Sequence, residues 1–242
     1  MSIRVGRVTT GAYGRWNMEK LDGYESIIPL TESTPHYQLS PYYLKNSKGF
    51  IMENIWQFSK VYEDIPVATW KPPKNTTDKT ISHPAETHIT DGKVNKNYWK
   101  WRSKGFKCPY PVRYPVGFNH RHKCLYALKS KKHMKQLGYI ESRKKIYLPI
   151  YQKLAKREKM FWDILEKVQN GKNILIFDVD GPHQESLEYY KKKYKIKNDF
   201  IQNNSVDVSD KKAMKILLDD EKHPFGHGYC LALALLKELN KK

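Results

Sequence analysis

Residues 173–182 read Asn-Ile-Leu-Ile-Phe-Asp-Val-Asp-Gly-Pro, an apolar run that ends in two carboxylates. Continuous hydrophobicity over a short stretch predicts a strand that is buried on both faces. Because alternate residues of a strand share a face, we expect Asp178 and Asp180 to point the same way. Pro182 is suited to the first position of a helix, with Asp180 or Gly181 as the cap. The stretch therefore predicts a strand, a turn that carries acids, and a helix.

Helical patterns lie on both sides of this strand. From His133 to Asn170, apolar residues recur at intervals of three and four with charged residues between them, and Asn170-Gly171 predicts where the helix ends. Cys230 to Leu239 is typical of an apolar helix, and residues 3–9 and 25–30 are typical of strands. We therefore expect a single α+β domain over residues 1–242, a small sheet with packed helices.

Two segments are predicted to be insertions in that domain. Residues from about 67 to 115 are dense in Pro, Thr, Asn, Lys and aromatic residues without helical periodicity, which predicts a loop insertion rich in proline and aromatic residues. Residues from about 183 to 222 suggest a helical insertion, with a short helix that Ser209 caps. Further helices are predicted after Ile51, up to Pro66, and from Tyr126 to Met134.

The stretch from Leu39 to Tyr62 places an acid, an amide and a lysine where apolar residues would be expected. If Glu53 opens a helix, Gln57 follows one turn later and Lys60 lies beside Gln57. A carboxylate, an amide and an ammonium on one face can hold a small polar ligand and move a proton. The same spacing also occurs on an ordinary solvated helix face.

The order of a Ser-rich aromatic turn, a short strand after Gly49 and Glu-x-x-x-Gln-x-x-Lys resembles the first motif of the NADAR (YbiA-like) proteins. The resemblance implies a small α+β enzyme that hydrolyses N-glycosidic bonds in ribosylated compounds; some members remove ADP-ribose from nucleic-acid bases. Where the family has Ser-Asn-Phe this chain has Ser40-Pro41-Tyr42, and where the family has Glu-His it has Glu53-Asn54. The closing Gly-x-Asn-x-Leu-Gly of the family corresponds to residues 226–229, Gly-His-Gly-Tyr.

These features give a set of candidate site residues for an N-glycosidic-bond hydrolase without cofactor or metal. Glu53 is the candidate for proton transfer, and Asp178 or Asp180 for a second carboxylate. The Gly-rich turn before the last helix offers N–H groups to a phosphate, because backbone donors at a helix start have no partner within the helix. The expected substrate-binding residues are Ser40, Tyr42, Trp56, Gln57, Lys60, Gly226, His227 and Gly228.

Two other kinds of site are weighed against this one. Asp-x-Asp-Gly superficially matches the phosphatase motif of haloacid dehalogenases, but that motif belongs near the start of a large parallel sheet and here it comes late in the chain. A zinc site can be drawn from Cys108, His120, His122 and Cys124. The wide gap between the cysteines lacks the close pair typical of zinc sites and favours free buried thiols.

The formal net charge of +19 predicts a polyanionic partner. We expect nucleic acid, bound mainly through its phosphates, besides a nucleotide or ADP-ribosyl ligand. The high Lys and Asn content is also typical of an AT-rich genome, as in many viruses, with lysines that only keep the surface soluble. The aromatic residues among the lysines can stack on bases or pack the loop. The candidate nucleic-acid-binding residues are Trp99, Trp101, Arg102, Lys131, Lys132 and Arg143.

Nothing near the N-terminus resembles a signal peptide, and no apolar run approaches the roughly 18 residues of a membrane span. Three widely spaced cysteines suit a reducing compartment. We expect an intracellular protein, which a virus could encode for use in the host cell. Two alternatives to hydrolysis stay open: a non-catalytic basic nucleic-acid-binding protein, and a glycosyl or base transferase in DNA modification.

Overall fold

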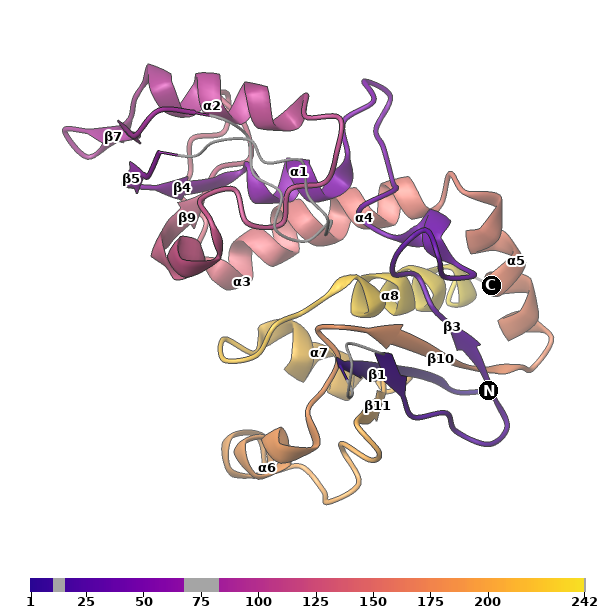
Figure 1. Ribbon diagram of the computed structural model, residues 1–242. Coiled ribbons are helices and arrows are strands. Elements are labelled where there is room, and N and C mark those ends of the chain that lie inside the picture. Colours follow the sequence, from indigo (N-terminus) through magenta and orange to yellow (C-terminus); the bar gives the residue numbers. More distant parts are fainter. Residues whose placement is uncertain (11–15, 68–82, 242) are drawn as a thin grey trace. The chain divides into compact units, whose positions relative to one another are not determined.

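The computed structural model describes residues 1–10, 16–67 and 83–241 (Figure 1). These residues form a mixed fold of α-helices and small β-sheets, in agreement with the expected α+β class. They divide into two compact units, which we describe separately. Unit 1 comprises Met1–Ser40 and Tyr151–Lys242, and unit 2 comprises Pro41–Ile150.

A five-stranded sheet forms the centre of unit 1. Strand β10 (Asn173–Asp178) lies inside it, parallel to β1 (Ile3–Thr10) on one side and to β3 (Tyr24–Ile27) on the other. Strands β11 (Ser205–Asp207) and β2 (Trp16–Met18) pair with β1 in the antiparallel direction. The apolar run of β10 is buried from Ile174 onward, which confirms the strand predicted from its sequence.

One helix of unit 1 covers this sheet, and a second helix packs on the first. Helix α8 (His227–Leu239) packs against β1 and β10, and α5 (Lys159–Gln169) packs against α8 (Figure 1). The predicted end of α5 is confirmed: Asn170 is its C-cap, and Gly171 takes a φ of +85°. In the part of the chain that the structure describes, no helix combines the length and the apolar character needed to cross a bilayer.

The segment predicted as a helical insertion is partly sheet. It contains η5 (Gln184–Ser186), α6 (Leu187–Tyr194) and α7 (Lys211–Asp219), but β11 lies between them and extends the central sheet through β1. The expected Ser209 cap is also wrong. The side chain of Asp210 caps α7 by accepting the N–H of Lys212, while the Ser209 hydroxyl accepts the N–H of Ile3. The predicted helix start at Pro182 is wrong too, because the first helical turn begins at Gln184.

Unit 2 consists of short elements around one aromatic core. The core includes Phe58, Tyr62, Tyr98 and Trp101, each at most 2% exposed. Helices in this unit include α1 (Met52–Gln57), α2 (Lys96–Phe106), η3 (Phe118–Lys123) and α3 (Tyr139–Ser142). The paired strands are β4 (Lys60–Tyr62) with β9 (Cys124–Ala127), β5 (Asp64–Ile65) with β6 (Glu86–Thr87), and β7 (Ile89–Thr90) with β8 (Lys93–Val94).

Helix α2 corrects the prediction of a long loop between residues 67 and 115; residues 68–82 of that segment lie outside the described part. The Asn95 side chain caps α2 by accepting the N–H groups of Asn97 and Tyr98. Its buried face also carries Gly105, where an added Cβ would lie 2.1 Å from the Phe58 ring. Only a glycine allows the helix to approach the ring this closely, so α2 packs directly against Phe58 of the core at this position.

Three further helix predictions are changed by the structure. The helix after Ile51 ends at Gln57 and gives way to β4, and the expected helix from Tyr126 to Met134 is the end of β9 followed by turns. The helical run expected from His133 starts at Tyr139 and passes through a π-helical segment (Arg143–Tyr147) into α4 (Leu148–Ala155). The π-helical segment ends two residues before Pro149, whose missing N–H disrupts regular α-helical bonding in the preceding turn.

Candidate functional site

Glu53 is the first candidate, and the structure places it in a hydrogen-bonded line of side chains in unit 2. The amide Nε2 of Gln57 donates to Glu53 Oε1 at 2.9 Å, and Lys60 Nζ donates to Gln57 Oε1 at 2.7 Å. Glu53 is 6% exposed and Gln57 is 8% exposed, whereas Lys60 at the start of β4 is half-buried. The predicted line therefore leads from a buried carboxylate to an ammonium at the surface.

The other expected substrate-binding residues of this region are Trp56, Tyr42 and Ser40. Trp56 is half-buried: the Lys60 ammonium lies 5.1 Å from its ring centroid, and its ring packs on Tyr147 with centroids 5.1 Å apart. Tyr42 is half-buried in unit 2. Ser40 is 2% exposed and is the last residue of the N-terminal part of unit 1. The Trp56 ring therefore lies against the ammonium at the end of the polar line.

Asp178 forms the second cluster, at the carboxyl end of β10 in unit 1. Its side chain is 0% exposed. Oδ1 accepts the N–H of Asp180 at 2.9 Å, and Oδ2 accepts the N–H of Gly228 at 2.5 Å. The carboxylate therefore joins the end of the central strand to the first turn of α8, where a negative charge is favourable.

Gly226 and His227 complete this cluster. A Cβ on Gly226 would lie 2.3 Å from Asp178 Oδ2, so a glycine is needed for the carboxylate to reach the helix. His227 Nε2–H donates to the carbonyl of Pro29 at 2.8 Å, which leaves Nδ1 facing Asp178 Oδ2 at 3.5 Å. The helix N-terminus that was expected to take a phosphate thus binds the protein's own carboxylate at the N–H of Gly228.

The fully buried phenol of Tyr151 lies beside this cluster. Its hydroxyl donates to the carbonyl of Leu39 at 2.7 Å, and its ring centroid is 6.2 Å from that of His227. Burial, then the neighbouring Cys230 and Asp178, raises the pKa of Tyr151 well above its ordinary value. The phenol is therefore neutral and serves as a fixed donor, which gives the cluster the character of a packed structural anchor.

The expectation that Asp178 and Asp180 share a strand face is wrong. The strand ends at Asp178, and Asp180 lies two residues beyond in a turn, half-buried, with its own N–H bonded to the Asp178 carboxylate. This is an Asx-type turn, in which the first acid closes the loop that carries the second. Glu53 belongs to unit 2, and both aspartates belong to unit 1.

The candidate nucleic-acid-binding residues divide by exposure. Arg102 is 6% exposed and donates to the carbonyls of Leu128 and Lys129, both at 2.7 Å, so its guanidinium holds a turn. Trp101 and Arg143 are each 2% exposed. These three side chains therefore pack in the interior and are not surface contacts. The remaining candidates, half-buried Trp99 and exposed Lys131 and Lys132, stay available at the surface.

A network around Asp220 in unit 1 was missed by the sequence reasoning. The carboxylate is 1% exposed and accepts from the hydroxyls of Tyr189 and Tyr190, both at 2.7 Å, and from His223 Nδ1 at 2.6 Å. Burial opposes ionisation, but the hydrogen bonds from Tyr190, Tyr189 and His223 outweigh it and lower the pKa of Asp220. The only sequence signal was the density of tyrosines in a lysine-rich helix.

The cysteines do not gather into a cluster with the histidines between them. Cys108 is buried in the core of unit 2, and Cys124 is half-buried with its thiol directed at the carbonyl of Tyr126 at 3.5 Å. Burial raises the pKa of Cys124. Within the described ranges, no group of three or more His, Cys, Asp or Glu side chains is arranged to hold a metal ion. Both thiols therefore behave as small buried apolar groups.

No protein-family model, no curated protein and no solved structure matches this chain.

Proposed function

We propose that this protein hydrolyses an N-glycosidic bond in an ADP-ribosylated or modified nucleotide or nucleic-acid base, with Glu53 as the proton-transferring group. The observation that carries the proposal is the line from buried Glu53 through Gln57 to Lys60. The resemblance of the same three residues to the first NADAR motif points to the same chemistry. Both considerations concern unit 2 and do not depend on the Asp178 cluster.

The geometry suits the demands of N-glycoside cleavage. As the base departs, the ribosyl group gains oxocarbenium character, and an adjacent carboxylate stabilises that positive charge and takes a proton from the attacking water. Glu53 is well buried, and charge interactions are stronger where water is excluded. Gln57 fixes one carboxylate oxygen, and Lys60 in turn fixes the amide of Gln57, so both act as positioning residues.

Replacing Glu53 by glutamine tests the proposal. The substitution keeps the shape of the side chain and removes the group that accepts the proton, so turnover should fall by about 10² to 10⁴. The assay is incubation with an ADP-ribosylated oligonucleotide, with NAD and with free ADP-ribose, followed by mass spectrometry of the released base and sugar. Glu63→Gln is the matched control, since Glu63 is exposed in the same unit. Full activity in Glu53→Gln would remove Glu53 from the mechanism.

Non-catalytic binding of nucleic acid is the second candidate function. Lys131 and Lys132 are exposed, and the Lys131 ammonium lies 5.6 Å from the ring centroid of half-buried Trp99. A ring beside exposed lysines can stack on a base while the ammonium groups contact phosphates. Binding to any duplex that weakens steeply with salt, without product, supports this candidate. A base or sugar transferase would use the same acids, and a product joined to an added acceptor would identify it.

A further inference from the structure

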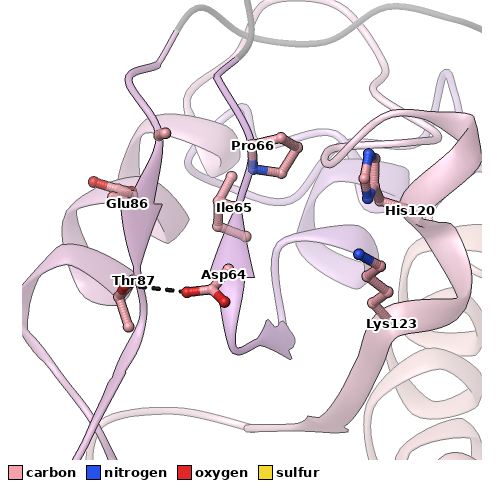
Figure 2. A pocket seen from close by; sticks show the side chains of 8 residues that line it. Asp64, Ile65, Pro66, Glu86, Thr87, His120 and Lys123 are labelled. Atoms are coloured by element: carbon pink, nitrogen blue, oxygen red, sulfur yellow. Dashed lines mark hydrogen bonds between the residues drawn. The ribbon is translucent and has the colours of Figure 1, made fainter.

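A hollow of about 400 Å³ opens in unit 2 between the β5–β6 pair and η3, within the size range of small-molecule sites (Figure 2). Asp64 and Thr87 stand on one side of it, and His120 and Lys123 stand on the other. Ile65 and Pro66 line it from β5. The hollow therefore has one acidic, hydroxylic wall and one basic wall, with apolar atoms beside them.

The basic wall is suited to an anion. Among the described residues, no carboxylate lies within 4 Å of the Lys123 ammonium, and no hydrogen-bond partner lies at the imidazole of His120. Both side chains come from η3 and face the same space (Figure 2). An ammonium and a ring N–H that converge without an internal partner match the oxygens of a phosphate, for which lysine acts as a point charge.

The opposite wall is suited to hydroxyl groups. Thr87 Oγ1 donates to Asp64 Oδ1 at 3.1 Å, and the two residues are paired across the antiparallel strands. An ionised carboxylate has about four acceptor positions, so Asp64 can accept further O–H donors. Glu86, which pairs with Ile65 instead, is held by Nε2–H of the fully buried His88 at 2.9 Å. A free phosphate would be repelled by Asp64, whereas a sugar hydroxyl would bind it.

We propose that this hollow binds a small phosphomonoester that carries vicinal hydroxyls, such as a pentose phosphate. The phosphate contacts Lys123 and His120, and the hydroxyls donate to Asp64 beside Thr87. The site is independent of the N-glycosidase proposal, because none of its residues belongs to the line of Glu53, Gln57 and Lys60. The variant Glu53→Gln should therefore bind a pentose phosphate as tightly as the wild type does.

Isothermal titration calorimetry of the full chain with ribose 5-phosphate, ribose and inorganic phosphate tests the proposal at about 0.15 M salt, where long-range attraction is screened. Lys123→Gln should weaken binding of ribose 5-phosphate by about tenfold or more, the loss expected for one charge-assisted hydrogen bond. Lys48→Gln is the matched control, because Lys48 is exposed elsewhere in unit 2, and it should leave the affinity unchanged. Ribose alone should bind far more weakly than its phosphate.

Asp64→Asn separates the two walls. The substitution removes an acceptor, so ribose 5-phosphate should bind more weakly. It also removes a negative charge, so inorganic phosphate should bind as tightly as before or more tightly. Equal losses in Lys123→Gln and Lys48→Gln would overturn the proposal in favour of diffuse attraction to a basic surface. Equal affinities for ribose 5-phosphate and inorganic phosphate, with no effect of Asp64→Asn on either, would overturn the assignment of the hydroxyls.

Discussion

Replacing Asp178 by alanine tests whether this carboxylate is a structural anchor of unit 1. The side chain is 0% exposed and accepts two backbone N–H groups, from Asp180 at 2.9 Å and from Gly228 at 2.5 Å. Alanine leaves both donors in the interior without their acceptor. A buried donor that loses its partner costs about 1–3 kcal/mol, and two of them set the expected loss in the free energy of unfolding at about 3 kcal/mol.

Urea denaturation followed by circular dichroism measures this loss, and hydrogen exchange at the Gly228 amide shows where it occurs. Asp199→Ala removes an exposed carboxylate from the same unit and should change stability by less than about 0.5 kcal/mol. Asp178→Asn retains one acceptor oxygen but turns an amide N–H₂ toward the other donor. Its loss should fall between those of the two alanine variants.

The result that refutes this reasoning is a stability of Asp178→Ala within error of that of Asp199→Ala. Unchanged protection of the Gly228 amide would lead to the same conclusion, since that N–H bonds the carboxylate directly. If such a variant had also lost hydrolytic activity, Asp178 would belong to the chemistry. The experiment therefore decides between the anchor that the structure describes and the second catalytic carboxylate expected from the sequence.

Two further predictions concern the packing of α2 and the Asp220 network. Gly105→Ala should lower the free energy of unfolding by about 2 kcal/mol through overpacking, because the new Cβ lies 2.1 Å from the Phe58 ring. Gly138→Ala is the control: nothing lies within 4 Å of its Cβ, so the melting temperature of this variant should be nearly unchanged. The pKa of Asp220 is lowered because its hydrogen bonds outweigh the effect of burial. The ionised side chain therefore contributes fully to the free energy of unfolding above the unfolded-state pKa, and this contribution is lost as the pH falls through the folded-state pKa. Tyr190→Phe removes one of these bonds and should move the midpoint of acid unfolding, followed by circular dichroism, to higher pH; an unchanged midpoint would contradict this.

Elements whose signal is local could be predicted from the sequence. The β10 strand follows from a continuous apolar run, and the end of α5 follows from Asn170-Gly171. Helix α2 was missed although its buried positions, Tyr98, Trp101, Arg102 and Gly105, have helical spacing. Two of the four, Arg102 and Gly105, are not apolar. Arg102 is buried because its guanidinium donates to two backbone carbonyls, and Gly105 is buried because it packs against the Phe58 ring. Hydrophobic periodicity therefore cannot detect such a face.

The candidate sites show the same division between local and distant contacts. Glu53 and Gln57 lie one turn apart in α1, and the pitch of a helix is enough to predict that they align, whereas Lys60 reaches Gln57 from the start of β4. The bond between Asp178 and the N–H of Gly228 joins residues fifty positions apart. Asp178 and the Gly-rich turn were both predicted as site residues, but no local pattern indicates that they bond to each other. The start of α8 was therefore expected to bind a phosphate. The Asp220 network combines residues thirty positions apart and had no local pattern.

Three acids are buried among the described residues, Glu53, Asp178 and Asp220, and they differ in what holds them. This difference bears on which one suits chemistry. Asp178 accepts from two backbone N–H groups, those of Asp180 and Gly228. Asp220 accepts from two phenols and an imidazole, which suits a fixed charge inside a packed network. Glu53 is held at Oε1 by a side-chain amide whose other end contacts the half-buried ammonium of Lys60. A ligand that displaces Lys60 would remove the hydrogen bond to Gln57 Oε1 and so change the environment of the Glu53 carboxylate.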